Sequence, residues 1–421
     1  MSRVEPSPAP GRPPGREVDW RPGGSDRVAG RRRRRLTIAA AVLVVAAGAI
    51  GALLLTRGGG GEPDVGTVAA AGQWRPMSAS PLSPRIGSAH VWTGRELVVW
   101  GGRTCAEGRC DDETVTHVAD GAAYDAEADA WRPLAPSPLS ARSGATGVWS
   151  GREMLVWGGR DATGPLSDGA AYDAEADTWR PLAPSPLSAR VAPAVWSGQE
   201  MLVWGGSVDA SGQQVFADGA AYDPAADTWR PLAPSPLRGR FDMLTEWSDR
   251  ELIVWGGRAG SENLADGAAY DPEADTWRTL APSPLSPRVV RGEWSGRELL
   301  VWGGEQGTEA LADGAAYDPA ADTWRSLSPA PLSARRGNAV VWSGRELLIW
   351  GGGGGTGAFL FATGAGYDPD ADAWRELPPS PGRFIPIAEW SGKEMLIWGG
   401  IVPGPRPATV EASSDGVRYR P

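Results

Sequence analysis

The 421-residue sequence has few of the side chains that usually carry chemistry or fill a core. It contains only two Cys and two His, and only 7 Tyr and 5 Phe beside 22 Trp. Two cysteines alone cannot complete a structural zinc site, which takes four ligands. Nucleophile motifs, phosphate-binding loops and metal-ligand clusters are also missing from the sequence. The sequence therefore assigns no catalytic residue, no metal and no cofactor.

Positive charge is scarce outside the N-terminal segment. Residues 1–57 hold 11 Arg and 4 acidic residues, a net of +7, which leaves −17 for the rest of a chain whose net charge is −10. Nucleic-acid binding relies on clustered Lys and Arg that neutralise phosphates. The charge distribution argues against a nucleic-acid partner.

The N-terminal segment predicts a membrane anchor. Residues 1–35 have the composition of a disordered basic tail and end in five consecutive arginines. Residues 36–55 are twenty uncharged, mostly aliphatic residues, enough for a transmembrane helix of about 30 Å. The positive-inside rule then places the N-terminus in the cytoplasm and the rest of the chain outside. Residues 56–72 form a flexible linker.

A cleaved export signal is the alternative interpretation of the same segment. The run 31–36 loosely resembles a twin-arginine signal, and Ala69, Ala70 and Ala71 form a candidate cleavage site. The protein would then be secreted. Both interpretations place residues 73–421 outside the cytoplasm.

The abundant tryptophan belongs to one repeat written seven times over residues 73–421. The pattern W-[ST]-[GD]-x-E-[LM]-x-[VI]-W-G-G has its first Trp at positions 92, 149, 196, 247, 294, 342 and 390. Its second Trp follows eight residues later, and a third Trp lies at positions 74, 131, 179, 229, 277, 324 and 374. The repeat accounts for every Trp except Trp20.

Each unit predicts four short strands. In the second unit, the first strand follows Arg142 and ends at Trp149, and a Ser-Gly turn leads to a second strand over 153–157. The continuous apolar character of 153–157 predicts burial on both faces. A third strand over 168–173 and a fourth strand around Trp179 complete the unit.

This repeat resembles the kelch family, whose units carry a Gly-Gly doublet, a Tyr and a Trp in this order. Here these are Gly158-Gly159, Tyr172 and Trp179, with equivalents in the other units. This family includes the galactose oxidase-like central domain. The resemblance implies an all-β, seven-bladed β-propeller. The last unit lacks its fourth strand, and residues 73–76 form a fourth strand without a unit before it. We therefore predict that the N-terminal strand completes the last blade and closes the ring.

Two charged positions recur in all seven units. One is a glutamate, as in Glu153, and the other is an arginine, as in Arg142. We expect structural Arg–Glu pairing between neighbouring strands. In some kelch proteins arginines at the channel mouth hold acidic peptides, so an anion-binding ring is the alternative. The seven arginines are Arg85, Arg142, Arg190, Arg240, Arg288, Arg335 and Arg383.

Residues that break the repeat are better candidates for ligand binding. Glu246, Glu293 and Glu389 stand where the other units have Val, and Arg291 lies two residues before Glu293. A charge that replaces an aliphatic residue on an inner strand is costly unless it is used or paired. His90 also departs from the repeat. If the three glutamates converge on the channel together with Arg291, we expect a site there.

The loops between the second and third strands differ in every unit, as expected for a binding surface on a constant scaffold. The first of these loops, 103–119, is the longest and contains Cys105 and Cys110. In an oxidising compartment these cysteines are expected to form a disulfide.

The sequence thus predicts a membrane-anchored binding module for a protein or carbohydrate ligand. The alternative is a carbohydrate-active enzyme of kelch fold. A copper radical oxidase of galactose oxidase type needs two His, two Tyr and a Cys cross-linked to a Tyr. The chain has only His90 and His117, its Tyr are nearly all part of the repeat, and Cys105 is expected to pair with Cys110. A sialate mutarotase needs only acid–base carboxylates and arginine.

Overall fold

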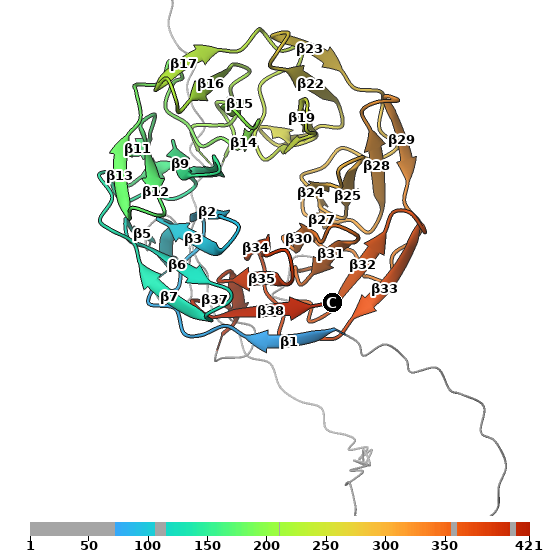
Figure 1. Ribbon diagram of the computed structural model, residues 1–421. Helices are drawn as coiled ribbons and strands as arrows, with labels where there is room; N and C mark the ends of the chain where they lie inside the picture. Colours follow the sequence, from blue (N-terminus) through green and yellow to red (C-terminus); the bar gives the residue numbers. More distant parts are fainter. Residues whose placement is uncertain (1–71, 106–114, 210, 355–359, 405–409) are drawn as a thin grey trace, which may run out of the picture. The chain divides into compact units, whose positions relative to one another are not determined.

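The computed structural model describes residues 72–105, 115–209, 211–354, 360–404 and 410–421. In these ranges the chain is all β and contains no helix. Seven four-stranded antiparallel sheets stand around a central axis as the blades of a β-propeller (Figure 1). The first strands of neighbouring blades contact each other around this axis, so they form the inner ring.

The blades follow the order of the chain. From the inner to the outer strand, they consist of β2 (Ala89–Trp92), β3 (Glu96–Trp100), β6 (Gly121–Asp125) and β7 (Ala130–Pro133); β8 (Thr146–Trp149), β9 (Glu153–Trp157), β12 (Gly169–Asp173) and β13 (Thr178–Pro181); β14 (Ala194–Trp196), β15 (Met201–Trp204), β16 (Gly219–Asp223) and β17 (Thr228–Pro231); β18 (Leu244–Trp247), β19 (Leu252–Trp255), β22 (Gly267–Asp271) and β23 (Thr276–Thr279); β24 (Gly292–Trp294), β25 (Leu299–Trp302), β28 (Gly314–Asp318) and β29 (Thr323–Ser326); β30 (Ala339–Trp342), β31 (Leu347–Trp350), β32 (Gly364–Asp368) and β33 (Ala373–Leu377); and β34 (Ile387–Trp390), β35 (Met395–Trp398), β38 (Gly416–Arg420) and β1 (Gln73–Pro76).

The second strand of each blade is buried on both faces, as its continuous apolar sequence predicts. In β9, Met154 and Val156 pack into the core shared with the first blade. Leu155 and Trp157 between them pack into the core shared with the third blade. Because successive side chains of a strand point to opposite faces, one strand serves two inter-blade cores.

The first strand begins later than expected, at Thr146 instead of directly after Arg142. Between them Gly144 takes a left-handed φ of 67°. The neighbouring doublet also needs glycine, because a Cβ on Gly159, whose φ is 85°, would lie 2.7 Å from the backbone nitrogen of Ala145. This close backbone approach delays the start of the regular ladder.

The N-terminal strand β1 lies at the outer edge of the last sheet (Figure 1). It pairs antiparallel with β38, with Trp74 opposite Tyr419. The Trp74 indole also donates a hydrogen bond to the carbonyl oxygen of Pro378, 2.7 Å away. Two segments more than 300 residues apart in sequence therefore share one sheet.

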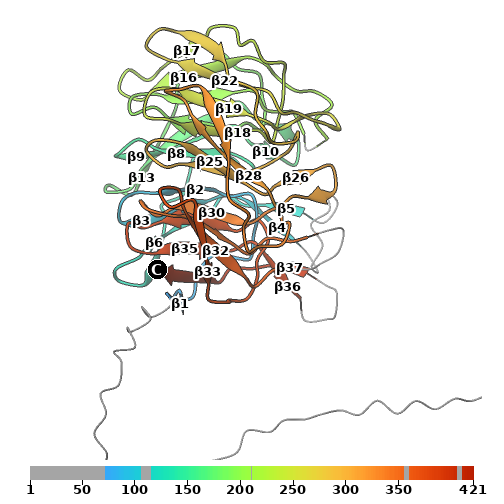
Figure 2. The ribbon, with the colours of Figure 1, turned by 90° about the vertical axis from the view of Figure 1, so that its right-hand side faces the viewer.

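The connections of the blades define two sides of the propeller. The loop side carries the links between second and third strands, and the turn side carries the tight turns between first and second strands. Figure 2 shows hairpins from several loops on the same side. These hairpins are β4 (Arg103–Cys105) with β5 (Val115–His117), β10 (Arg160–Asp161) with β11 (Gly164–Pro165), β20 (Arg258–Ala259) with β21 (Glu262–Asn263), β26 (Glu305–Gln306) with β27 (Glu309–Ala310), and β36 (Ile401–Pro403) with β37 (Val410–Ala412).

Several predictions concern residues outside the described ranges. The tail, the membrane helix and nearly all of the linker lie within residues 1–71, and the Cys105–Cys110 disulfide depends on residues 106–114. Across the ranges that are described, no helix is long and apolar enough to cross a bilayer.

Candidate functional site

The seven repeat arginines are buried, with at most 3% of each residue exposed. In the second blade, the guanidinium of Arg142 donates to both carboxylate oxygens of Asp168, at 2.7 and 3.0 Å, and to the carbonyl of Gly158. Its remaining groups donate to the carbonyl and the hydroxyl of Ser140. These hydrogen bonds lower the pKa of Asp168. The N–H groups of this guanidinium thus all donate to acceptors within the protein.

In the other blades the repeat arginine also pairs with a carboxylate, with one exception. Arg335 has no carboxylate partner among the described residues and donates to the carbonyl and hydroxyl of Thr363, while burial lowers its pKa to about 10. The remaining pairs are Arg85–Asp120 at 2.8 Å, Arg190–Asp218 at 2.7 Å, Arg240–Asp266 at 2.9 Å, Arg288–Asp313 at 2.7 Å and Arg383–Asp415 at 3.0 Å.

The prediction that these arginines pair with the repeat glutamates is therefore wrong, because their carboxylate partners are aspartates. Arg142 lies beside the Gly158-Gly159 turn at the loop side, whereas Glu153 begins β9 at the turn side. Glu153 instead forms a bidentate pair with Arg180 on the outer strand, with Nη2–Oε2 at 2.6 Å. Arg180 also donates to the Tyr222 hydroxyl of the next blade, which ties neighbouring blades together.

The residues that break the repeat come together in the central channel. Glu246 on β18, Glu293 on β24 and Glu389 on β34 are close enough for the charges of Glu246 and Glu389 to act on Glu293. The charge of Arg291 acts on Glu293 and on His90. The described residues contain no ion pair within 4.0 Å that joins Glu246, Glu293 or Arg291 to another group. The three glutamates thus lie near one another, whereas an ion pair of Arg291 with Glu293 is not present among the described residues.

This setting shifts the protonation of the channel groups toward their neutral forms. Burial, and then the charge of Glu389, raises the pKa of Glu246 to about 8, and burial raises the pKa of Glu389 to about 7. Burial and the two neighbouring carboxylates raise the pKa of Glu293 well above its usual range. Burial lowers the pKa of His90 to about 4.

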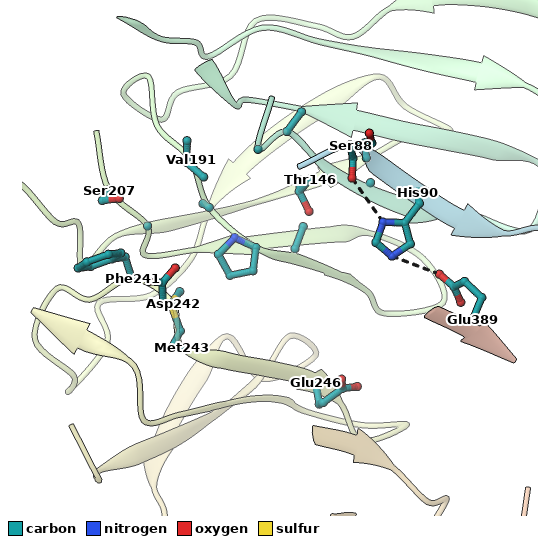
Figure 3. Close-up of a pocket in the computed structure, with 18 residues that line it drawn as sticks. Ser88, His90, Thr146, Val191, Ser207, Phe241, Asp242, Met243, Glu246 and Glu389 are labelled. Atoms are coloured by element: carbon teal, nitrogen blue, oxygen red, sulfur yellow. Dashed lines mark hydrogen bonds and ion pairs between the residues drawn. The ribbon is translucent and has the colours of Figure 1, made fainter. Parts of the chain in front are cut away.

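His90 and Glu389 face each other across neighbouring blades. Figure 3 shows the ring of His90 pointing at Glu389, and the distance from Nε2 to the Glu389 Oε1 is 3.7 Å. Burial disfavours the charged form of His90, and the distance is longer than a hydrogen bond. Their side chains remain 31% and 26% exposed, so solvent reaches both.

A cavity of about 550 Å³ connects these groups with the loop side. His90, Glu246 and Glu389 line its inner part, and Phe241, Asp242 and Ser207 line the part near the loops (Figure 3). The cavity is large enough for a side chain or a small ligand. A ligand entering from the loop side would reach the carboxyl groups.

Two residues at this mouth have a backbone conformation that favours glycine. Asp242 and Ile385 have φ values of 51° and 47°, and the equivalent Gly144 has 67°. For a β-branched residue such as Ile385 this conformation is strained. The strain places an isoleucine and a carboxylate where three other blades have glycine, and Asp242 pairs with Arg258 at 2.6 Å. The sequence signal was present, because both residues replace a glycine of the repeat.

The comparisons agree with the repeat analysis. The family model for the KLHDC2/KLHL20/DRC7 Kelch-repeats domain matches residues 69–237 and 194–400. No curated protein matches the chain.

Proposed function

We propose that the chain is a membrane-anchored, extracytoplasmic binding protein. The chain belongs to the kelch-repeat family, whose propellers are typical protein-interaction modules, and this supports the binding role. We further propose that it takes a protein ligand on the loop side of the propeller. The ligand would place a cationic side chain in the channel.

The anchor is supported by the sequence of residues 31–55, five arginines followed by twenty uncharged residues. The test is fractionation of the full-length protein, followed by N-terminal sequencing. We expect it to resist extraction from membranes with carbonate and to be cut by added protease only on the extracytoplasmic side. A mature N-terminus near Ala71 would instead show a cleaved signal and a secreted protein.

The observation that carries the ligand proposal is a group of three carboxyl groups that form no ion pair with an Arg or Lys within the described part of the chain. Glu246 and Glu389 share one cavity, and Glu293 is electrostatically coupled to both. Their pKa values are raised because ionisation in the channel is unfavourable without a counter-charge. A guanidinium or ammonium group would supply that charge and favour the ionised carboxylates.

The test uses blocked peptides that carry one arginine, one lysine or one norleucine between glycines, titrated into the full-length protein. We expect the cationic peptides to bind and the norleucine peptide not to bind. Binding needs ionised carboxylates, so affinity should rise about tenfold or more between pH 6 and pH 9. Glu246→Gln should remove the binding, and Glu273→Gln, an exposed change on the turn side, should not. Equal binding of the norleucine peptide would contradict the proposal.

A carbohydrate-active enzyme is a second candidate, because two carboxyl groups with pKa values of about 7 and about 8 share a cavity with an uncharged histidine. Groups that titrate near neutral pH can donate and accept protons in catalysis. The test is the rate of anomeric exchange of sialic acid, measured by NMR. Acceleration that Glu389→Gln abolishes would establish this activity, and an uncatalysed rate would leave binding alone.

A further inference from the structure

The first tryptophan of each repeat has a different environment from the other two. The second tryptophans are at most 2% exposed, and third tryptophans such as Trp179 donate their indole N–H to a backbone carbonyl. The first tryptophans are half-buried at the turn side, as in Trp149, which packs on the core of two blades. Six of them, within the ranges that the structure describes, have no hydrogen-bond acceptor for the indole N–H: Trp92, Trp149, Trp196, Trp247, Trp342 and Trp390.

Two of these tryptophans, Trp149 and Trp196, line grooves between neighbouring blades. A groove of about 730 Å³ between the first and second blades contains Trp149 and the bidentate pair of Arg132 with Glu96. An equivalent groove of about 800 Å³ between the second and third blades contains Trp196 and the pair of Arg180 with Glu153. Each groove thus combines an aromatic ring, a guanidinium and a carboxylate. It lies on the side opposite the mouth of the channel.

The seventh of the first tryptophans, Trp294, does have a hydrogen-bond acceptor for its indole N–H. Trp294 donates its indole N–H to the Asp249 carboxylate of the preceding blade, at 2.7 Å. Asp249 replaces the turn glycine of the repeat and has a left-handed φ of 66°. An oxygen acceptor thus fits beside this tryptophan, and the chain supplies one in this groove.

The equivalent turns leave that place open. A Cβ built on Gly94 or Gly151 would meet no atom within 4 Å, and the same holds for the turn glycines of the remaining blades. Open space, a free indole N–H and a half-exposed aromatic ring therefore occur together. Large half-exposed aromatic side chains in a concave site commonly mark ligand binding.

We propose that these grooves bind a saccharide chain, with a sugar ring against each free first tryptophan. A sugar presents an apolar ring face to the indole and hydroxyl groups that both donate and accept hydrogen bonds. The indole N–H is a donor without an acceptor among the described residues, and the Glu96 carboxylate, which Arg132 holds in place, can accept from a further hydroxyl group. A proline-rich peptide also fits aromatic grooves, but proline has no N–H to give to the carboxylates. Each groove binds one short oligosaccharide, and a longer polymer would reach several grooves at once.

The test is calorimetric titration of the full-length protein with maltohexaose, cellohexaose and chitohexaose, with decaproline as the peptide probe. At least one oligosaccharide should bind. Asp249→Gly frees Trp294 and should raise the number of sites by one, a gain that a purely structural tryptophan cannot give. Trp149→Ala should remove one site, and Trp294→Ala, in the groove already filled by Asp249, should leave the number unchanged.

A second variant protects the test against misfolding. If Trp149→Ala lowers the melting temperature strongly, Gly94→Asp keeps the tryptophan and places a carboxylate beside it, which should also remove one site. Absence of oligosaccharide binding at millimolar concentration would overturn the proposal. So would binding whose stoichiometry none of these variants changes, or binding of decaproline in place of the sugars.

Discussion

Glu153 and Glu246 are the same side chain in two regions of the propeller, and their surroundings are opposite. Glu153, at the turn side, accepts two hydrogen bonds from Arg180. Glu246, in the channel, has no cation within ion-pair distance among the described residues, and burial raises its pKa to about 8. The framework therefore uses its charges to hold blades together, whereas Glu246 in the channel is not paired with a cation of the described residues.

The largest effect should come from breaking the framework at its seam. Deletion of residues 73–77 removes β1, leaves the edge of β38 unpaired and removes the Arg75 partner of Glu394. We expect a loss on the order of 5 kcal/mol in the free energy of unfolding, measured by denaturant titration. Deletion of residues 58–62 serves as the matched control. Equal stability of both deletion variants would contradict closure of the ring by this strand.

The next largest loss of stability is expected from two buried arginines of the framework, and it should differ between them. Arg288→Met removes a guanidinium that binds Asp313 and two further groups, and should cost about 2–4 kcal/mol. Arg335→Met should cost about half as much, because Arg335 has only Thr363 in place of the carboxylate. Arg152→Met, at a side chain that is 80% exposed, should change stability by less than about 0.5 kcal/mol. Thermal melting ranks the three variants, and an equal loss for Arg288 and Arg335 would remove the role assigned to the aspartate.

The pH dependence of stability sharpens the comparison of the two glutamates. The folded-state pKa of Glu246 is raised to about 8, so its contribution is present below the unfolded-state pKa and is lost as the pH rises toward 8. Glu246→Gln should therefore match the wild type near pH 4 and exceed it at pH 9 by about 1–2 kcal/mol, a value reduced by solvent in the channel. Glu153→Gln should be less stable than the wild type from pH 6 to pH 9. Denaturant titrations across this range would show the opposite signs, and a destabilised Glu246→Gln at pH 9 would refute this account.

The smallest effect concerns the mouth of the channel. Ile385→Gly relieves a left-handed φ of 47° and should stabilise the protein by up to about 1 kcal/mol, in spite of the entropy cost of glycine. Val290→Gly changes the equivalent position of another blade, where φ is not positive, and should destabilise it by about 1 kcal/mol. Chemical denaturation of the two variants measures this difference in sign. A loss of stability in both would mean that side-chain packing outweighs the strain.

Much of the fold could be predicted from the sequence because it is local and repeated. In the second strand of the second blade, the four residues that follow Glu153 are all apolar, and this pattern predicts a strand covered on both faces. The candidate site followed from the same regularity, since Glu246, Glu293 and Glu389 replace valine on inner strands. Asp242 and Ile385 could have been found in the same way, by the glycine that they replace.

The partners of the charges could not be predicted in this way. Most units repeat two arginines, a glutamate and an aspartate, and either arginine is a plausible partner for either acid. The order of these residues along the chain does not show which of them lie at the same end of the blade. The antiparallel pairing of the strands determines this, because it places Arg142 with Asp168 at the loop side and Glu153 with Arg180 at the turn side.

The sequence by itself thus determined the number of blades, the strands within each blade and the positions that depart from the repeat, because these depend on composition and period. Only the tertiary structure decided which residues are neighbours across blades. It brings His90 from the first blade to Glu389 of the last, and it places Asp249 on Trp294 while the equivalent grooves stay open. The physical reason is the ring itself, since contacts between blades and across the channel join residues that no local pattern relates.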